Sequence, residues 1–359
     1  MSSLKAMDLP QILLTVGILT RNSSRTLPET LASLAAQTYP EDLWKVIMID
    51  HDSSDETLTL ASVFVSSRKN ARLLSNFENN LARSRQMIVE SSDAEWVCFI
   101  DSDVVLPANW LAIAARHIQS EDSALGAGFA GPLRLKPLHR NLLILETLQT
   151  ISLGHFYTAQ MWVPSQPKRV SHLPTAAAVF RRESLMKIGG FDLARAHTGE
   201  DLDLGERLSG AGMELWLFPD LEVIHRLTCQ GRRGWLARAF RFGVARIQVA
   251  MRLPHLFWGP QIILPLLFAV AQVAGLFILG LAILEGRGQL IFSCLVFLLS
   301  WPLGLLIGMS AGLLTKSRGG LILPAAGLAL LTQIAYAGGE VWGVFEIIIK
   351  ALSGGKREQ

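Results

Sequence analysis

The sequence predicts an α/β domain with a mainly parallel sheet, followed by a basic amphipathic helix and about three apolar helices. Short apolar segments alternate with helical patterns between residues 11 and 131, which is typical of parallel strands joined by helices. Charge is divided unevenly along the chain. Residues 1–222 carry 20 basic and 26 acidic side chains, net −6, and residues 223–359 carry 13 basic and 4 acidic, net +9.

The composition excludes several classes of protein. Half of the 359 residues are hydrophobic and 18% are charged, which excludes a disordered chain and a coiled coil. The three cysteines, Cys98, Cys229 and Cys294, form no C-x-x-C pair, so neither a disulfide framework nor a zinc site is expected. We expect no nucleic-acid partner, and the sequence does not indicate an oligomeric state.

Each element of the α/β domain follows from its local pattern. The apolar segments predict strands at Ile12–Leu19, Lys45–Ile49, Arg72–Leu74, Trp96–Ile100 and Ala124–Phe129. The helical patterns between them cover roughly residues 27–37, 54–67, 80–91 and 107–119. The first apolar stretch is interpreted as a buried strand and not as a signal peptide, because no small-residue cleavage site follows it.

Long stretches without charge predict three transmembrane helices. No charged residue occurs for 32 positions after Arg252, for 28 after Arg287 and for 21 after Arg318. A helix of about 20 apolar residues crosses a bilayer. The predicted spans lie near residues 261–284, 290–314 and 321–349, and they predict a multi-pass protein of the inner membrane.

The segment before the first span predicts an amphipathic helix. Leu236, Phe240, Val244, Ile247 and Met251 fall on one helical face, which suits either the membrane surface or packing on the preceding domain. Seven arginines and no acid lie between Glu222 and the first span, so this side is predicted to be cytoplasmic. The predicted domains are therefore 1–228, cytosolic and catalytic, 229–256, the interfacial helix, and 257–352, the membrane helices.

Polar residues follow the predicted strands where a ligand would bind. In open α/β sheets ligands bind beyond the carboxyl ends of the strands, where this chain has Thr20, Asp50, Asp52 and Asp101. The turn after the first strand lacks the glycine fingerprint of dinucleotide-binding oxidoreductases.

The strongest single signal is Asp101-Ser102-Asp103, directly after an apolar strand. Two carboxylates one residue apart can face one cation while Ser102 points elsewhere. Hard divalent ions bind carboxylate oxygens together with substrate phosphates. The triplet therefore predicts a metal–diphosphate site.

A second acidic group opens a predicted helix at Gly199-Glu200-Asp201-Leu202-Asp203. Acidic residues also favour a helix N-terminus for electrostatic reasons. The functional interpretation is that Asp201 or Glu200 acts as a general base and takes a proton from an acceptor hydroxyl.

These motifs, in this order over roughly residues 11–225, resemble family 2 glycosyltransferases of the GT-A fold. The segment from Thr15 to Asn22 resembles the family's first strand, and Ile49 to Thr57 resembles its D-D/N-G-S-x-D-x-T motif. Asn80 to Gln86 resembles G-x-x-x-A-R-N, with Arg85 at the arginine. The triplet at 101–103 resembles D-x-D, and Gly189 to Asp192 with Glu200 to Leu204 resembles the G-G-F-D and E-D-x-D-L pair. The basic helix and apolar C-terminal part are similar to bacterial exopolysaccharide transferases of the succinoglycan type.

The resemblance implies a nucleotide-diphosphate sugar donor, with UDP-sugar expected, and a Mg²⁺ or Mn²⁺ cofactor. It implies donor contacts from Thr20, Asn22, Asp50, Asp52, Arg85, Asp101 and Ser102. It implies metal binding by Asp101, Asp103 and His225, and inverting transfer with Asp201 as base and Glu200 as its alternative. The acceptor is expected to be membrane-associated and polyprenyl-linked. Arg232, Arg233 and Trp235 are expected to contact the acceptor or a phosphate of donor or acceptor.

Three alternatives remain open at the level of sequence. A processive polysaccharide synthase would keep the fold but needs enough membrane helices for a channel. A non-catalytic membrane scaffold would keep the fold without the reaction. A nucleotidyltransferase would use the same carboxylates but release pyrophosphate.

Overall fold

The computed structural model describes residues 14–78, 80–120, 126–137, 165–192, 199–227, 231–253, 260–300 and 322–352. The chain divides into two compact units. The first, called here the sheet unit, comprises Met1–Lys136 and Thr158–Leu227. The second, the helical unit, comprises Pro137–Tyr157 and Thr228–Gln359.

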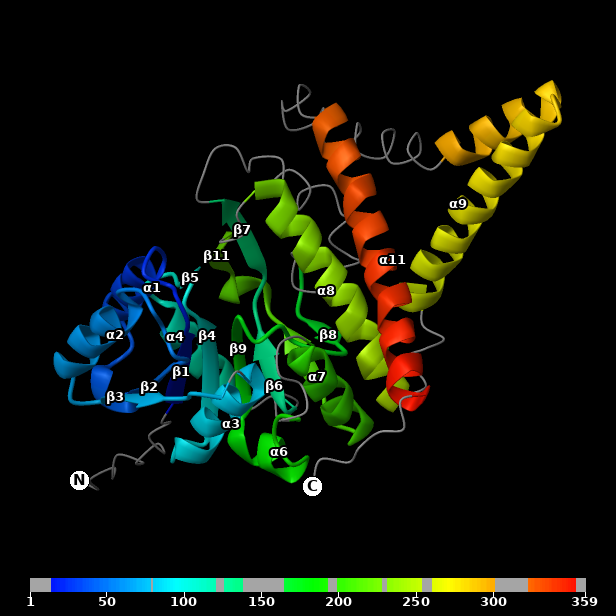
Figure 1. Ribbon diagram of the computed structural model, residues 1–359. Helices are drawn as coiled ribbons and strands as arrows, with labels where there is room; N and C mark the ends of the chain where they lie inside the picture. The colour runs from blue at the N-terminus through cyan, green and yellow to red at the C-terminus, as the bar shows by residue number, and fades with distance from the viewer. Residues whose placement is uncertain are drawn as a thin grey trace, which may run out of the picture. The chain divides into compact units, whose positions relative to one another are not determined.

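An eight-stranded sheet forms the centre of the sheet unit, in the order β3-β2-β1-β4-β9-β6-β10-β8 (Figure 1). Neighbouring strands from β3 to β4 are parallel, and β9 is antiparallel to both β4 and β6. The strands are β1 (Leu14–Thr20), β2 (Trp44–Asp50), β3 (Ala71–Ser75), β4 (Trp96–Asp101), β6 (Gly128–Ala130), β8 (Lys168–Val170), β9 (Ala177–Arg181) and β10 (Leu215–Leu217). A second sheet joins β5 (Val104–Val105), β11 (Val223–Leu227) and β7 (Leu133–Pro137) in the order β5-β11-β7.

Alternation along the buried strands produces two cores, one on each face of the sheet. In β1, Leu14, Val16 and Ile18 point to one face, as expected from the two-residue period of a strand. This face packs on α1 (Leu27–Ala35), α2 (Thr57–Ser66) and α4 (Trp110–Gln119). The other face packs on α3 (Leu81–Ser91), α6 (Arg182–Lys187) and α7 (Glu200–Gly210).

A glycine in β1 allows α3 to lie close to the sheet. A Cβ atom added at Gly17 would lie 2.5 Å from the side chain of Ile88. A larger residue at this position would push α3 away from β1, and with it the polar residues that α3 carries at its N-terminal half.

The predicted α/β fold is confirmed. The five predicted strands correspond to β1, β2, β3, β4 and β6, and the four predicted helices to α1 to α4. Residues 12, 13, 124 and 125 of the predicted strands lie outside the described residues. The helix predicted to start at the second acidic group is α7.

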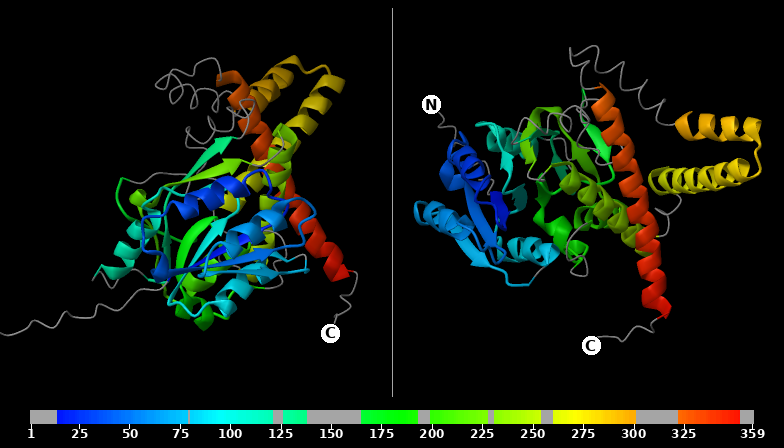
Figure 2. Two further views of the ribbon diagram at one scale, coloured as in Figure 1. Left: turned by 90° about the vertical axis from the view of Figure 1, so that its left-hand side faces the viewer. Right: turned by 45° about the horizontal axis from the view of Figure 1, so that its top comes forward.

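The helical unit contains α8 (Gly231–Arg252), α9 (Pro260–Leu284), a helix described over residues 288–300, and α11 (Ile322–Leu352). Two further views show α8 and α11 side by side (Figure 2). Glycines make this contact close: a Cβ atom at Gly243 would lie 2.1 Å from the Tyr336 carbonyl oxygen, and one at Gly339 would lie 2.0 Å from that of Phe240. Ile247, Ala250 and Ile262 form the small core between α8, α9 and α11.

The predicted apolar face of α8 is wrong in part. Ile247 is buried, but Phe240 and Met251 are 36% and 51% exposed. The buried face contains Trp235, Ala239, Gly243, Ile247 and Ala250. Small residues dominate it because α8 packs tightly on α11, so residue size decides which face is buried as much as residue polarity does.

The prediction of a multi-pass membrane protein is contradicted. Within the described residues, no helix combines the length and the apolar character that crossing a bilayer requires. The first and third predicted spans correspond to α9 and α11, and the second to the helix at 288–300, while residues 301–314 of that span lie outside the described residues.

One buried carboxyl group in the helical unit makes stability depend on pH. Glu340 is 0% exposed, and burial raises its pKa to about 9, an effect that the nearby Arg246 opposes. In the unfolded chain the same group titrates near 4.5. The folded state therefore loses stability relative to the unfolded state as the pH rises from about 4.5 towards 9.

We predict that Glu340→Gln stabilises the protein at pH 8.5 by about 2 kcal/mol and changes it much less at pH 5. Urea unfolding at both pH values measures the difference. Glu346→Gln is the matched control, because Glu346 lies on the same helix and already accepts a hydrogen bond of 2.7 Å from Trp342. An equal effect of Glu340→Gln at both pH values would contradict the assignment.

Candidate active site

The strand register brings three predicted site residues to one edge of the sheet. Thr20 at the end of β1 pairs with Asp50 at the end of β2, and Leu19 pairs with Asp101 at the end of β4. Because β1 lies between β2 and β4, the carboxyl ends of the three strands meet at the position where ligands bind in open α/β sheets.

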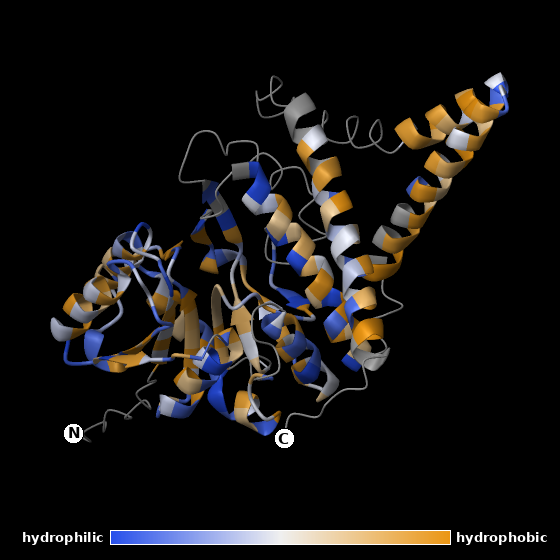
Figure 3. Cartoon of the chain, viewed as in Figure 1, coloured by the Kyte–Doolittle hydropathy of each residue, from blue (hydrophilic) through white to orange (hydrophobic). Residues whose placement is uncertain are grey.

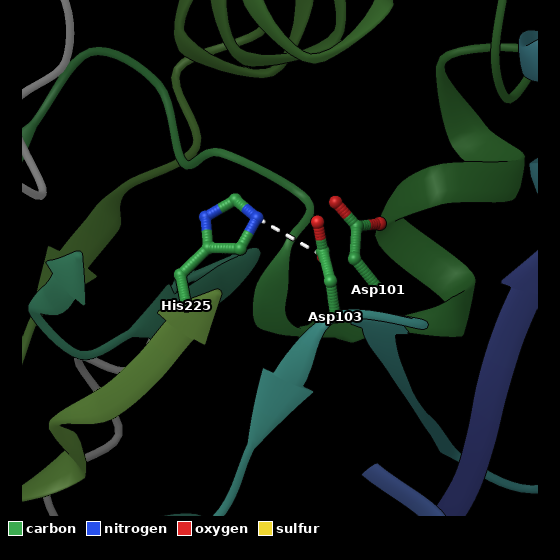
Figure 4. A group of neighbouring side chains, drawn as sticks. All are labelled: Asp101, Asp103 and His225. Atoms are coloured by element: carbon green, nitrogen blue, oxygen red, sulfur yellow. Dashed lines mark ion pairs between the residues drawn. The ribbon is translucent and has the colours of Figure 1, made fainter. Parts of the chain in front are cut away.

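A cluster of metal-binding groups lies at this edge. Asp101, Asp103 and His225 each offer one ligand atom, and these atoms lie within 4.8 Å of one another. The imidazole Nε2 of His225 lies 3.0 Å from Oδ1 of Asp103. Figure 4 shows the three side chains close together, with Asp101 from the end of β4, Asp103 from the turn that follows it and His225 from β11.

The donor set fits a divalent cation. Two carboxylates and one imidazole suit Mn²⁺ or Mg²⁺, which complete their coordination with water or phosphate oxygens. Burial raises the pKa of Asp101, and the charges of Asp103 and Glu200 add to this while Arg85 and His225 oppose it. The crowding of negative charge behind that shift is what a bound cation would relieve.

The Asp50 carboxylate is held rigidly at the end of β2. Thr20 Oγ1 donates to Asp50 Oδ1 at 2.9 Å, and the Ser53 hydroxyl donates to the same oxygen at 2.7 Å. The Ser53 backbone N–H donates to Oδ2 at 3.0 Å. Asp50 is 3% exposed, so the structure joins Thr20 and Asp50 in one hydrogen-bonded group.

The two loops beyond Thr20 and Asp50 are also linked. Asn22 Oδ1 accepts a hydrogen bond of 2.8 Å from the backbone N–H of Ser54, and Asn22 donates its own N–H to the Ser53 hydroxyl at 3.0 Å. Asn22 and Asp52 both adopt positive φ values, 47° and 51°, and Asp52 is exposed. The structure therefore ties Asn22 to this group and leaves Asp52 at its surface.

Ser102 connects the metal cluster to the loop after β1. Its hydroxyl lies 2.7 Å from the hydroxyl of Ser23. The predicted donor contact of Ser102 stays a prediction.

The acidic start of α7 lies against α3. Arg85 of α3 forms an ion pair with Glu200 and a second one, at 3.4 Å, with Asp101. Asp201 follows Glu200, and burial raises its pKa, with a further contribution from Asp101 and an opposing one from Arg85. A carboxylate whose pKa lies above its usual value is a stronger proton acceptor, as a general base requires.

Strand β11 carries His225, and hydrogen bonds of the next residue, Arg226, hold the strand in place. The backbone N–H of Arg226 donates to the Asp103 carbonyl at 2.7 Å, and Arg226 Nε donates to Glu29 of α1 at 2.8 Å. These contacts fix the register of β11 against the turn after β4, so His225 stays beside Asp103.

The three predicted acceptor residues belong to α8 of the helical unit. Arg232 and Arg233 are exposed. Trp235 is 9% exposed, and its indole N–H donates to the Thr332 hydroxyl of α11 at 2.9 Å. This is the environment of a packing residue, and it gives no support to the predicted acceptor contact of Trp235.

The comparison with protein families decides the identity of the domain. Residues 15–189 match the family model described as Glycosyl transferase family 2. The chain contains a family 2 glycosyltransferase domain. The match covers β1 through α6 and includes the Asp101–Asp103 turn.

Characterised relatives carry the same domain in longer chains. The pre-mycofactocin glycosyltransferase of Mycobacterium tuberculosis is 32% identical over 182 residues, which is 48% of this chain and 35% of the relative. The poly(ribitol-phosphate) β-N-acetylglucosaminyltransferase TarS of Staphylococcus aureus is 31% identical over 108 residues, 29% of this chain and 18% of the relative. The matched segments thus span about a third or less of the length of these relatives.

A solved structure shows the same fold for the transferase domain. The mannosyltransferase PcManGT of Pyrobaculum calidifontis, in complex with GDP-mannose and Mn²⁺, superposes with a TM-score of 0.54 at 17% identity. The match covers 93% of this chain and 87% of that one. It establishes the GT-A fold that the sequence resemblance implied.

Four residues that support the candidate site were not predicted from the sequence. They are Ser23, Glu29, Ser53 and Arg226, which hold the predicted residues in place. Ser53 lies inside the segment from Ile49 to Thr57 that resembles a family motif, so the sequence could have indicated it. Ser23 and Glu29 could not, because their partners Ser102 and Arg226 are 79 and 197 positions away.

We predict that Asp103→Asn lowers the affinity of the transferase for Mn²⁺ by at least about tenfold, because it removes one carboxylate oxygen from the cluster. Titration with Mn²⁺ alone, followed by the electron paramagnetic resonance signal of the free ion, measures the affinity. Asp93→Asn serves as control, since Asp93 is an exposed aspartate paired with Lys45. Unchanged Mn²⁺ binding by Asp103→Asn would refute the metal site.

Proposed function

We propose that the protein is an inverting glycosyltransferase that uses a nucleotide-diphosphate sugar and a divalent cation, with residues 1–228 as the catalytic domain. The observation that carries the proposal is the Asp101–Asp103–His225 cluster at the carboxyl edge of a family 2 domain, with Asp201 nearby. The GT-A fold and the family match support the reaction class.

We assign the donor to the hydrogen-bonded group at the ends of β1 and β2. Asp50 presents a buried carboxylate that the Thr20 and Ser53 hydrogen bonds hold still. Such a carboxylate can accept a hydrogen bond from an N–H group of a nucleobase. The ordered loop around Asn22 would border the nucleoside, and a UDP-sugar is the donor that we propose to test first.

The residues of the turn after β4 would hold the cation. Mn²⁺ or Mg²⁺, when bound by Asp101, Asp103 and His225, would neutralise charge that develops on the leaving diphosphate. His225 must be neutral to serve as a ligand, and its Nε2 lies 3.0 Å from Asp103 Oδ1, close enough for one cation to bind both groups.

Asp201 would take the proton from the acceptor hydroxyl. Its backbone neighbour Leu202 donates to Asp201 Oδ1 at 2.8 Å, which fixes the carboxylate at the start of α7. Removal of the proton as the new bond forms lets the hydroxyl oxygen attack the sugar from the face opposite the leaving diphosphate. This arrangement inverts the anomeric configuration.

We also propose a lipid-linked saccharide as the acceptor, in the assembly of an exopolysaccharide or glycolipid of the succinoglycan type. The support is the exposed apolar surface of α9, on which Val270, Val273, Leu276 and Phe277 are between 59% and 67% exposed (Figure 3). Exposed apolar surface of this extent indicates contact with an apolar partner.

The reaction is tested with the purified chain, Mn²⁺ and a panel of UDP- and GDP-sugars. We expect release of nucleoside diphosphate, whereas a nucleotidyltransferase would release pyrophosphate. Asp201→Asn should lower turnover by about 100-fold or more while UDP binding persists. Asp220→Asn, which changes a surface carboxylate paired with His117, should leave turnover unchanged. Normal turnover in Asp201→Asn would exclude Asp201 as the base.

The acceptor is tested with a bacterial lipid extract and a radiolabelled donor sugar. We expect label to enter the organic phase, in short products and not in polymer. Water-soluble oligosaccharides serve as the comparison at equal concentration. Transfer to the soluble sugars with none to the lipid fraction would contradict the lipid-linked acceptor, and long products would indicate a processive synthase.

A further inference from the structure

The position of Arg85 differs from the one that the family resemblance implied. That resemblance placed Arg85 near the donor diphosphate. In the structure the side chain is 4% exposed and lies between two carboxylates on different elements. Its Nη1 donates to Glu200 of α7, and its Nη2 donates to Asp101 of β4 at 3.4 Å.

The third nitrogen of this guanidinium, Nε, pairs with neither carboxylate. Nε of Arg85 is buried and has no hydrogen-bond partner among the described residues. Both terminal nitrogens already donate to carboxylates of the protein, and the side chain is only 4% exposed, so little of the guanidinium is open to a diphosphate. A role in holding the protein's own carboxylates fits the geometry better.

The two carboxylates that Arg85 joins belong to the two halves of the proposed reaction. Asp101 is part of the metal cluster on the donor side. Glu200 precedes Asp201, the proposed base, and is itself 5% exposed. Because Glu200 and Asp201 are adjacent in the first turn of α7, a contact that holds Glu200 also holds the backbone turn from which Asp201 projects.

The next residue of α3 supports the same region. Gln86 accepts a hydrogen bond of 3.0 Å from the backbone N–H of Phe191. A Cβ atom at Gly190 would lie 2.1 Å from the same Gln86 oxygen. Helix α3 therefore holds both the start of α7 and the glycine turn that precedes it in sequence.

We infer that Arg85 is a positioning residue that holds the base-bearing start of α7, through Glu200, at a fixed place relative to the metal-binding Asp101. Glu200 is then the partner of Arg85 and not an alternative base. The inference rests on the proposed function. It concerns the distance between the metal-binding Asp101 and the base-bearing start of α7. Turnover depends steeply on this distance, because a shift of about 1 Å can lower the rate about 100-fold.

A double-mutant cycle on Arg85 and Glu200 tests the pairing. We expect Arg85→Met and Glu200→Gln each to lower the rate of Mn²⁺-dependent UDP-sugar turnover by about 10- to 100-fold. The Kd of UDP with Mn²⁺, measured by calorimetry, should stay within about threefold of wild type, because neither residue contacts the donor. The double variant should be no slower than the slower single variant, since both changes break the same contact.

Two further variants complete the design. Arg83→Met is the matched control: Arg83 lies on the same helix but forms an exposed pair with Glu90, so turnover should not change. Arg85→Lys keeps the charge and one hydrogen bond, so it should recover part of the lost rate. If circular dichroism shows that Arg85→Met does not fold, the turnover and UDP Kd of Arg85→Lys and Glu200→Gln are compared with those of wild type instead.

The outcomes separate this inference from the proposed function. A UDP Kd raised tenfold or more in Arg85→Met, with the maximal rate unchanged, would make Arg85 a diphosphate ligand and overturn the inference. Additive rate losses in the double variant would also overturn it. If the wild-type chain neither binds UDP nor turns over any donor, the proposed function is refuted before the variants are compared. The inference, which rests on that function, is then refuted as well.

Discussion

Crowding of negative charge at one edge of the sheet is the constraint on which the rest of the structure depends. Asp101, Asp103, Glu200 and Asp201 gather there, and Arg85 is the buried cation that pairs with two of them. Burying like charges together is unfavourable unless they are paired or bind a cation. The proposed metal ion would relieve this repulsion, because a bound cation pairs with the carboxylates.

The fold assembles this edge from elements that reach it from different directions. The parallel strands β1, β2 and β4 end there side by side, while α3 and α7 bring Arg85 and the acidic turn from one face. Strand β11 of the small sheet adds His225, and the contacts of Arg226 hold it in register. No element supplies both the metal ligands and the proposed base, so their separation is set by packing between elements.

In the helical unit, small residues allow two helices to pack closely. Helices α8 and α11 approach each other through Gly243 and Gly339, and they bury Glu340 and Thr332 between or beside them. Which residues of these helices are buried depends on the contact between them, which a single sequence does not contain.

The sequence by itself determined the order of strands and helices, the acids that end the strands and the D-x-D triplet, because these depend on local periodicity and on neighbours in the chain. Only the tertiary structure decided which charges are partners. Arg85 and Glu200 are separated by 115 positions, and nothing in their local patterns links them. It also decided which face of α8 is buried and that Trp235 packs on Thr332, because contacts between distant segments depend on how whole elements pack.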